Sequence, residues 1–142
     1  MRVSDVLSSK GSDQVFTIDP TATVSDLLDA FAAHDVGALV VADDSGMLGV
    51  VSERDVVRKL RGVAEPGGAT VASIMTTDVR TCSPEDSFGA LMALMTEHRV
   101  RHVPVLLDGE LVGILSIGDA VKHRMDQLEF ERDQLTSYVA GG

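Results

Sequence analysis

Two short stretches of the chain place a serine three residues ahead of an aspartate, and both follow a run of apolar residues. They are Ser52 with Asp55 and Ser116 with Asp119. An apolar β-type run that ends in serine predicts a strand leading directly into a helix. The free N–H groups at such a helix start suit a phosphate. A carboxylate in the first turn can accept hydrogen bonds from both hydroxyls of a ribose.

The same spacing also has a purely structural interpretation. Ser-x-x-acid is the pattern of a capping box, in which the two side chains satisfy backbone N–H groups at the start of a helix. Aspartate fits this box less well than glutamate, and both copies carry aspartate. The spacing alone does not choose between a helix cap and a ligand site, and the two roles can coexist.

The two motifs belong to an internal duplication with a period of 64 residues. In each half the pattern predicts a short helix, a strand, an amphipathic helix, a hairpin and a further helix. The predicted first strands cover residues 15–18 and 79–82. Identities at this offset include Val15/Val79, Thr17/Thr81, Pro20/Pro84, Leu27/Leu91, His34/His98, Val36/Val100, Gly49/Gly113, Ser52/Ser116 and Asp55/Asp119.

The predicted fold class is therefore α/β (α+β), with two pseudo-symmetric β-α-β-β-α units that pack as one module and an extended C-terminal helix. The expected division of the chain is residues 1–61 for the first unit, 62–70 for a linker, 71–122 for the second unit and 123–142 for a helical tail.

Composition limits the classes of function. Twelve basic and twenty-two acidic residues give a net charge of −10, which argues against a nucleic-acid binder. No apolar run reaches the ~20 residues of a membrane span. The single cysteine, Cys82, cannot form an internal disulfide, so we expect a cytoplasmic protein. Neither a catalytic constellation nor a metal-ligand cluster stands out, so we expect a protein that is not an enzyme and has no metal site.

The tail predicts a continuous helix with an imperfect heptad pattern. Val121, Leu128 and Leu135 are spaced by seven residues, and so are Met125, Arg132 and Val139. The helix could fold back on its own unit. We favour self-association through it, because so long a tail has little else to bury against.

The duplicated Gly-hydrophobic-x-Ser-x-x-Asp motif, the hairpins and the repeat together resemble a tandem pair of cystathionine-β-synthase (CBS) domains, the pair called a Bateman module. The resemblance covers Val3 to about Lys122. It implies two clefts between the units that bind adenosine-containing ligands: AMP, ADP or ATP, and sometimes S-adenosylmethionine or NAD. It also implies that the motif aspartate holds the ribose hydroxyls and that the serine lies near the phosphates.

The resemblance assigns two sets of residues. One cleft would combine the second motif with a basic pair at the start of a strand and with the first strand of unit one. The other would use the first motif and the segment entering unit two, with Arg54 or Arg58 in place of the basic pair. The expected members are Asp119, Ser116, Arg101, His102, Val15 and Phe16 in the first set, and Asp55, Ser52, Thr76, Val79 and Arg54 in the second.

The basic pair decides the expected ranking of the clefts. Arg101 can bind a phosphate bidentately, and His102 would add charge if its pKa is raised. We therefore expect the Asp119 cleft to bind a phosphorylated adenosine better than the Asp55 cleft. For Arg99 we favour a position on a solvated turn.

The expected function is that of a regulatory module, a homodimer that senses an adenine nucleotide and modulates a partner protein not yet identified. No tightly bound cofactor is expected, and whether Mg²⁺ accompanies ATP stays open. The alternatives are a scaffold protein with empty clefts, in which the motif only caps helices, and a sensor of S-adenosylmethionine or NAD.

Overall fold

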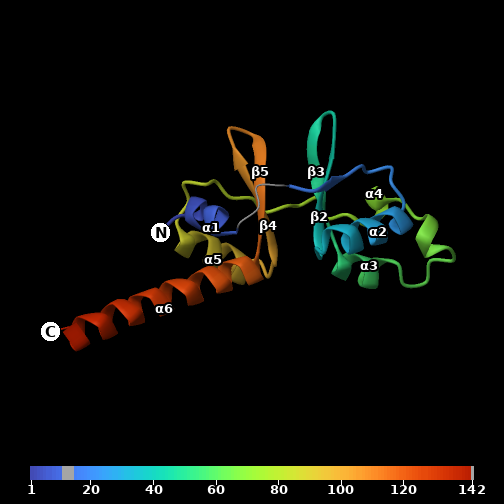
Figure 1. Ribbon diagram of the computed structural model, residues 1–142. Helices are drawn as coiled ribbons and strands as arrows, with labels where there is room; N and C mark the ends of the chain where they lie inside the picture. Colours follow the sequence, from blue (N-terminus) through green and yellow to red (C-terminus); the bar gives the residue numbers. More distant parts are fainter. Residues whose placement is uncertain (11–14, 142) are drawn as a thin grey trace.

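The computed structural model describes residues 1–10 and 15–141. The elements follow the predicted order twice, and the last helix is the longest (Figure 1). They are α1 (Val3–Ser9), β1 (Thr17–Ile18), α2 (Val24–His34), β2 (Ala38–Asp43), β3 (Gly46–Ser52), α3 (Glu53–Lys59), the 3₁₀ turn η1 (Pro66–Gly68), α4 (Val71–Ile74), α5 (Phe88–Glu97), β4 (His102–Leu107), β5 (Glu110–Ser116) and α6 (Ile117–Gly141).

Two antiparallel hairpins form the centre of the molecule, and helices flank them in two groups (Figure 1). The register of β2 against β3 shifts after Val41, and that of β4 against β5 shifts after Val105, one repeat further on. β1 adds a parallel third strand beside β2. The predicted duplication of the fold is thus confirmed down to the position of a bulge.

The predicted strand over residues 79–82 is wrong, because only Cys82 pairs, in a single bridge with Val105. Cys82 donates its N–H to the carbonyl of Pro104 and accepts from the N–H of Leu106. Pro104 has no N–H with which to continue the ladder toward Arg80. Its counterpart in the first unit is Val40, which pairs with β1.

The short helices at the start of each half are exchanged between the two cores. Val3 and Val6 of α1 are fully buried in the core of the second half, which includes Phe88 and Leu91. Val71 and Ile74 of α4 are buried in the core of the first half, which is built on Val24, Leu27, Phe31 and the first hairpin. Neither range, 1–61 or 71–122, therefore contains a complete hydrophobic core.

A glycine allows this exchange to form. Val50 and Thr76 exchange two backbone hydrogen bonds, of 3.0 and 2.8 Å, so the segment after α4 lies directly on β3. A Cβ atom on Gly49 would lie 2.5 Å from the carbonyl oxygen of Thr76. A Cβ atom on Gly113 would lie 2.6 Å from a methyl group of Leu7, which is the end of a flexible side chain. The motif glycine thus marks where the exchanged segment touches the sheet.

The last helix, α6, extends over 25 residues and runs away from the rest of the molecule (Figure 1). Among its residues only Ala120 is fully buried. Within residues 1–10 and 15–141, none of the helices combines the length and the hydropathy that a membrane span requires.

We expect Gly49→Ala to lower the free energy of unfolding by about 1–3 kcal/mol, because the backbone of Thr76 cannot move aside without breaking its bonds to Val50. Gly113→Ala should cost less, since Leu7 can rotate. Gly68→Ala is the control, because a Cβ atom added there would have no other atom within 4 Å and the φ of Gly68 is not left-handed. Urea unfolding measures all three, and equal losses at residues 49 and 68 would contradict the role of the close approach.

Candidate functional site

A cleft with a volume of about 340 Å³ lies at the start of α3, where the first half meets the segment that enters the second. This volume is within the range of small-molecule sites. Its walls come from both halves of the repeat. The lining residues are Gly37, Val50, Ser52, Glu53, Arg54, Asp55, Thr76, Asp78, Val79, Arg80, Arg99, Val100, Arg101 and His102.

Asp55 closes the capping box of α3. Its Oδ2 accepts hydrogen bonds from the backbone N–H of Ser52 at 2.9 Å and from the Ser52 hydroxyl at 3.1 Å. Its Oδ1 lies 3.2 Å from Nζ of Lys59 and 3.4 Å from Oγ1 of Thr76. One oxygen therefore serves the helix, and the other meets groups that a ligand hydroxyl can replace. The cap and the ligand site coexist geometrically.

The cleft is basic, although the protein as a whole is acidic. Four arginines line it, against the three carboxylates of Glu53, Asp55 and Asp78. Arg80 lies 3.8 Å from Asp78, and both side chains are well exposed. The arginines are Arg54, Arg80, Arg99 and Arg101.

The structure adds residues to the set that the sequence predicted for the Asp55 cleft. Arg101 and His102 line the Asp55 cleft, and they also lie beside the second motif, because His102 pairs with Ser116 and the carbonyl of Arg101 accepts from the N–H of Ile117. Arg99 lies on an exposed turn, as expected, and this turn also forms part of the wall of the cleft. Arg80 was not among the expected residues. A left-handed backbone at Arg99, with φ of 53°, repeats that of Asp35 one period earlier, so this turn geometry belongs to the fold.

The arginines of the Asp55 cleft are not repeated at the equivalent positions of the other half. Each arginine of the Asp55 cleft has an uncharged or acidic counterpart one period away. These counterparts are Gly118 for Arg54, Phe16 for Arg80, Asp35 for Arg99 and Gly37 for Arg101. The repeat also maps Gly37, which lines the Asp55 cleft, onto Arg101, so Arg101 belongs to the surroundings of both motif aspartates.

The side chain of His102 is partly buried. Burial lowers the pKa of its imidazole below the ordinary value, and Lys10 and Arg101 lower it further. Asp119 and Glu53 act in the opposite direction but do not reverse the shift. The condition under which His102 would add charge, a raised pKa, is therefore not met, and His102 is a neutral hydrogen-bonding group at pH 7 in the unliganded protein.

Asp119 has different surroundings. Its Oδ2 accepts from the backbone N–H of Ser116 at 2.9 Å and lies 3.2 Å from Nζ of Lys10. Lys10 also donates to the carbonyl of Ile114 at 2.7 Å. On its α1 side Asp119 borders a hollow of about 180 Å³. The chain between Lys10 and Val15 lies outside the described residues.

The two expected residues of the first strand are partly buried. Phe16 packs against the first core and stacks on the ring of His34, with ring centroids 3.7 Å apart. Neither Val15 nor Phe16 lines a described cavity that includes Asp119. Thr76, Val79 and Arg54 do line the cleft of Asp55.

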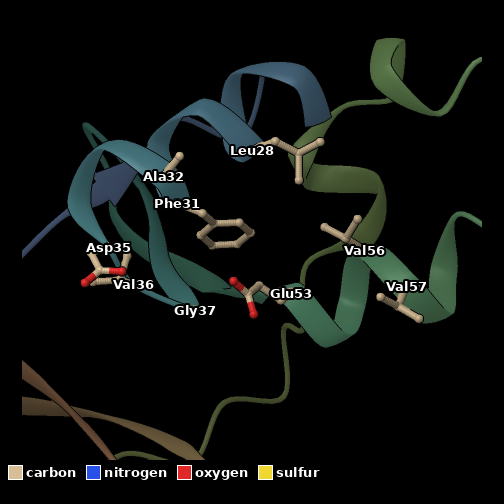
Figure 2. Close-up of a pocket in the computed structure, with 9 residues that line it drawn as sticks. All are labelled: Leu28, Phe31, Ala32, Asp35, Val36, Gly37, Glu53, Val56 and Val57. Carbon is tan, nitrogen blue, oxygen red and sulfur yellow. The ribbon is translucent and has the colours of Figure 1, made fainter.

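A second cavity, of about 660 Å³, lies between α2 and α3 (Figure 2). Its walls are mostly apolar, and Glu53 carries its carboxylate toward the ring of Phe31 (Figure 2). Glu53 and Gly37 also line the cleft of Asp55, so the two hollows are neighbours. Leu28 and Val57 also line this cavity, and both side chains are exposed to solvent.

The other reactive side chains do not form a site among residues 1–10 and 15–141. No three His, Cys, Asp or Glu side chains gather there as a metal site would require. Burial raises the pKa of the Cys82 thiol to about 11, with a smaller contribution from Asp86. The thiol is therefore protonated and unreactive at neutral pH.

Comparison with known proteins gives consistent matches. The CBS domain family model matches residues 3–62 and 71–126. The CBS domain-containing protein CBSX3, mitochondrial, of Arabidopsis thaliana is 34% identical over 99% of this chain and 72% of its own length. The crystal structure of the CBS-domain containing protein ATU1752 from Agrobacterium tumefaciens is 40% identical, with a TM-score of 0.82 over 87% of this chain and 99% of the other.

CBSX2, crystallised in complex with AMP, is 23% identical and superimposes with a TM-score of 0.73 over 88% of this chain and 97% of its own. At this identity the match shows the fold. The duplicated sequence, the two matched family segments and the shared architecture agree, and the chain therefore belongs to the CBS domain family, as a tandem pair.

Proposed function

We propose that this protein is a regulatory module whose Asp55 cleft binds a phosphorylated adenosine. The observation that carries the proposal is the gathering of four arginines around a carboxylate at the junction of the two halves. Arginine forms paired hydrogen bonds with phosphate oxygens, and it keeps its charge at any physiological pH. An anion held there is neutralised locally, although the whole chain carries −10.

Each part of an adenine nucleotide has a counterpart in the cleft. The Oδ1 atom of Asp55 and the hydroxyl of Thr76 suit the ribose diol. Apolar side chains suit the adenine ring, and the arginines suit the phosphates. The apolar group consists of Val50, Val79 and Val100. That CBSX2 holds AMP supports the view that this fold accommodates such a ligand.

The proposed ranking of the clefts is the reverse of the sequence expectation. Each motif aspartate has a lysine Nζ at 3.2 Å, so the difference lies in the arginines of the Asp55 cleft, whose equivalent positions one period away carry no positive charge. We therefore assign the more highly phosphorylated ligand, ADP or ATP, to the Asp55 cleft. A ligand in the Asp119 cleft would carry fewer phosphates.

The proposal also includes a homodimer and a partner protein whose activity the module modulates. The walls of the cleft come from both halves, so a ligand that binds them together favours one arrangement of the halves over others. One competing function has a specific observation behind it. Asp55 is already engaged by its capping box and by Lys59, as a scaffold protein without a ligand would have it.

Calorimetric titration with AMP, ADP, ATP, S-adenosylmethionine and NAD separates sensor from scaffold. We expect Asp55→Asn to weaken binding of the preferred nucleotide by at least about tenfold, because it removes charge-assisted hydrogen bonds to the ribose. Asp119→Asn is the matched control, with the same capping geometry in the other cleft, and should leave that affinity nearly unchanged. No heat with any ligand would favour the scaffold.

The phosphate side of the cleft has its own test. Arg101→Gln should weaken binding of ATP more than binding of adenosine, because only the phosphates contact the guanidinium. Arg58→Gln is the control, since Arg58 does not line the cleft. Repeating the ATP titration with Mg²⁺ and with EDTA shows whether the arginines suffice without a cation. An equal loss for ATP and adenosine would remove Arg101 from the phosphate site.

His102 links binding to pH. Its pKa lies below the ordinary value in the unliganded cleft, and a phosphate beside it would raise that pKa, so binding should take up a proton. We expect nucleotide affinity to rise as pH falls from about 7.5 to 6. In His102→Gln the affinity should depend on pH less strongly, because only the ionisation of the ligand's own phosphate remains. Calorimetric titration in buffers of different ionisation enthalpy gives the number of protons taken up on binding. His98→Gln is the control, because His98 is exposed.

A further inference from the structure

The exposed apolar residues of α6 lie mainly on one stripe, here called the seam. The five apolar residues of the seam are between 45% and 71% exposed. In a heptad description they alternate between d and a positions, with a single charged residue at a central a position. The seam consists of Val121, Met125, Leu128, Arg132, Leu135 and Val139.

The seam does not face the body of the protein. Ala120, His123 and Gln127 are the least exposed residues along the first turns of α6, and they mark the side that meets α1 and β5. At 3.6 residues per turn, the centre of the seam lies roughly 120° around the helix from that side. A second helix can therefore lie along the seam without collision with the body that carries it.

Beyond Gln127 the helix has no buried residue, and all of its side chains are exposed. An isolated helix of fewer than about 12–15 residues is marginal in water, and local pairs add only a few tenths of a kcal/mol each. The pair of Lys122 with Asp126, at 2.9 Å, is of this kind. The free end thus carries an apolar stripe and lacks the packing that normally stabilises a helix.

We propose that α6 pairs with α6 of a second copy of this chain as a parallel, in-register, two-stranded coiled coil along the seam. This deepens the homodimer in the proposed function and does not depend on nucleotide binding. The occupant is a second copy because the seam is complementary to itself. Each apolar d residue meets its own equivalent, and the 19 residues from Val121 to Val139 span almost three heptads.

The charges beside the seam select the parallel orientation. In a parallel pair, Arg124 at a g position faces Glu129 at an e position of the second copy. Arg132 at its a position can reach Glu131 of the second copy. In an antiparallel pair along the same seam, Glu129 would oppose Glu129 and Glu131 would oppose Glu131. Opposite charges meet in one arrangement and like charges in the other.

Sedimentation of the full chain tests the seam. Leu128→Glu places a charge in the middle of it and should raise the dimer dissociation constant by more than about tenfold. Phe130→Glu is the matched control, since Phe130 is 63% exposed on the same helix but points away from the seam by roughly 180°. It should leave the dimer intact. Dimers that survive Leu128→Glu, or that both variants weaken equally, would overturn the proposal.

A cysteine variant tests the orientation. Val139→Cys should form a disulfide-linked dimer under mild oxidation, because equivalent a positions face each other in a parallel pair. In an antiparallel pair the two copies of residue 139 would be about 27 Å apart. The unaltered chain is the background control, because Cys82 is buried. A sedimenting dimer that does not cross-link through residue 139 would exclude the parallel pair.

The charge pairs allow a reversal experiment. Arg124→Glu and Glu129→Arg should each weaken the dimer several-fold, and the double variant should restore it. Failure of the double variant to recover would contradict the pairing of these residues across the dimer.

A variant on another surface tests whether the dimer forms elsewhere. Val57→Asp, on the exposed face of α3, should leave the dimer unchanged. Dissociation of this variant would place the interface at the cavity between α2 and α3. Leu128→Glu should keep its nucleotide affinity, so failure of the dimer and failure of the sensor are separable.

Discussion

Val50 and Thr76 bond to each other through their backbones, and this contact requires that residue 49 has no side chain. The contact fixes the segment after α4 on the sheet of the first half. α4 then completes the first core, and the chain continues into the second half with Val79 and Arg80 already in the wall of the cleft. At the other end of the molecule, α1 completes the second core in the same way. The site exists because the two halves exchange these segments, so cleft and core have one origin.

Much of this architecture is encoded locally and could be predicted. The amphipathic stripe of α2, its Thr23 cap and the hairpin turn at Asp108 and Gly109 each depend on neighbours in sequence. The period of 64 residues then transfers every such feature to the other half. Even the failure at residues 79–82 has a local cause, the missing N–H of Pro104, and it could have been read from the sequence.

The composition of the cleft could not be predicted in the same way. Which residues of the second half line the cleft of Asp55 depends on how two similar units are placed against each other, and a strand pattern contains no information about that placement. The lowered pKa of His102 likewise arises from burial and from charges contributed by distant segments. Sequence spacing identified the aspartates, because each serves its own helix. It did not identify Arg80 or Arg99 as residues of this cleft, because they come from the other half of the chain.

The concentration of arginines in one hollow of a strongly acidic chain affects how an anion arrives there. Far from the surface, the excess negative charge repels a nucleotide, and the positive lining acts only near the mouth of the hollow. At physiological ionic strength fields fade over about 8 Å, so dissolved salt screens the distant repulsion more than the attraction at close range. Modest salt should therefore raise the association rate of the anion, while it weakens the final complex. The association rate and the affinity then respond to salt in opposite directions.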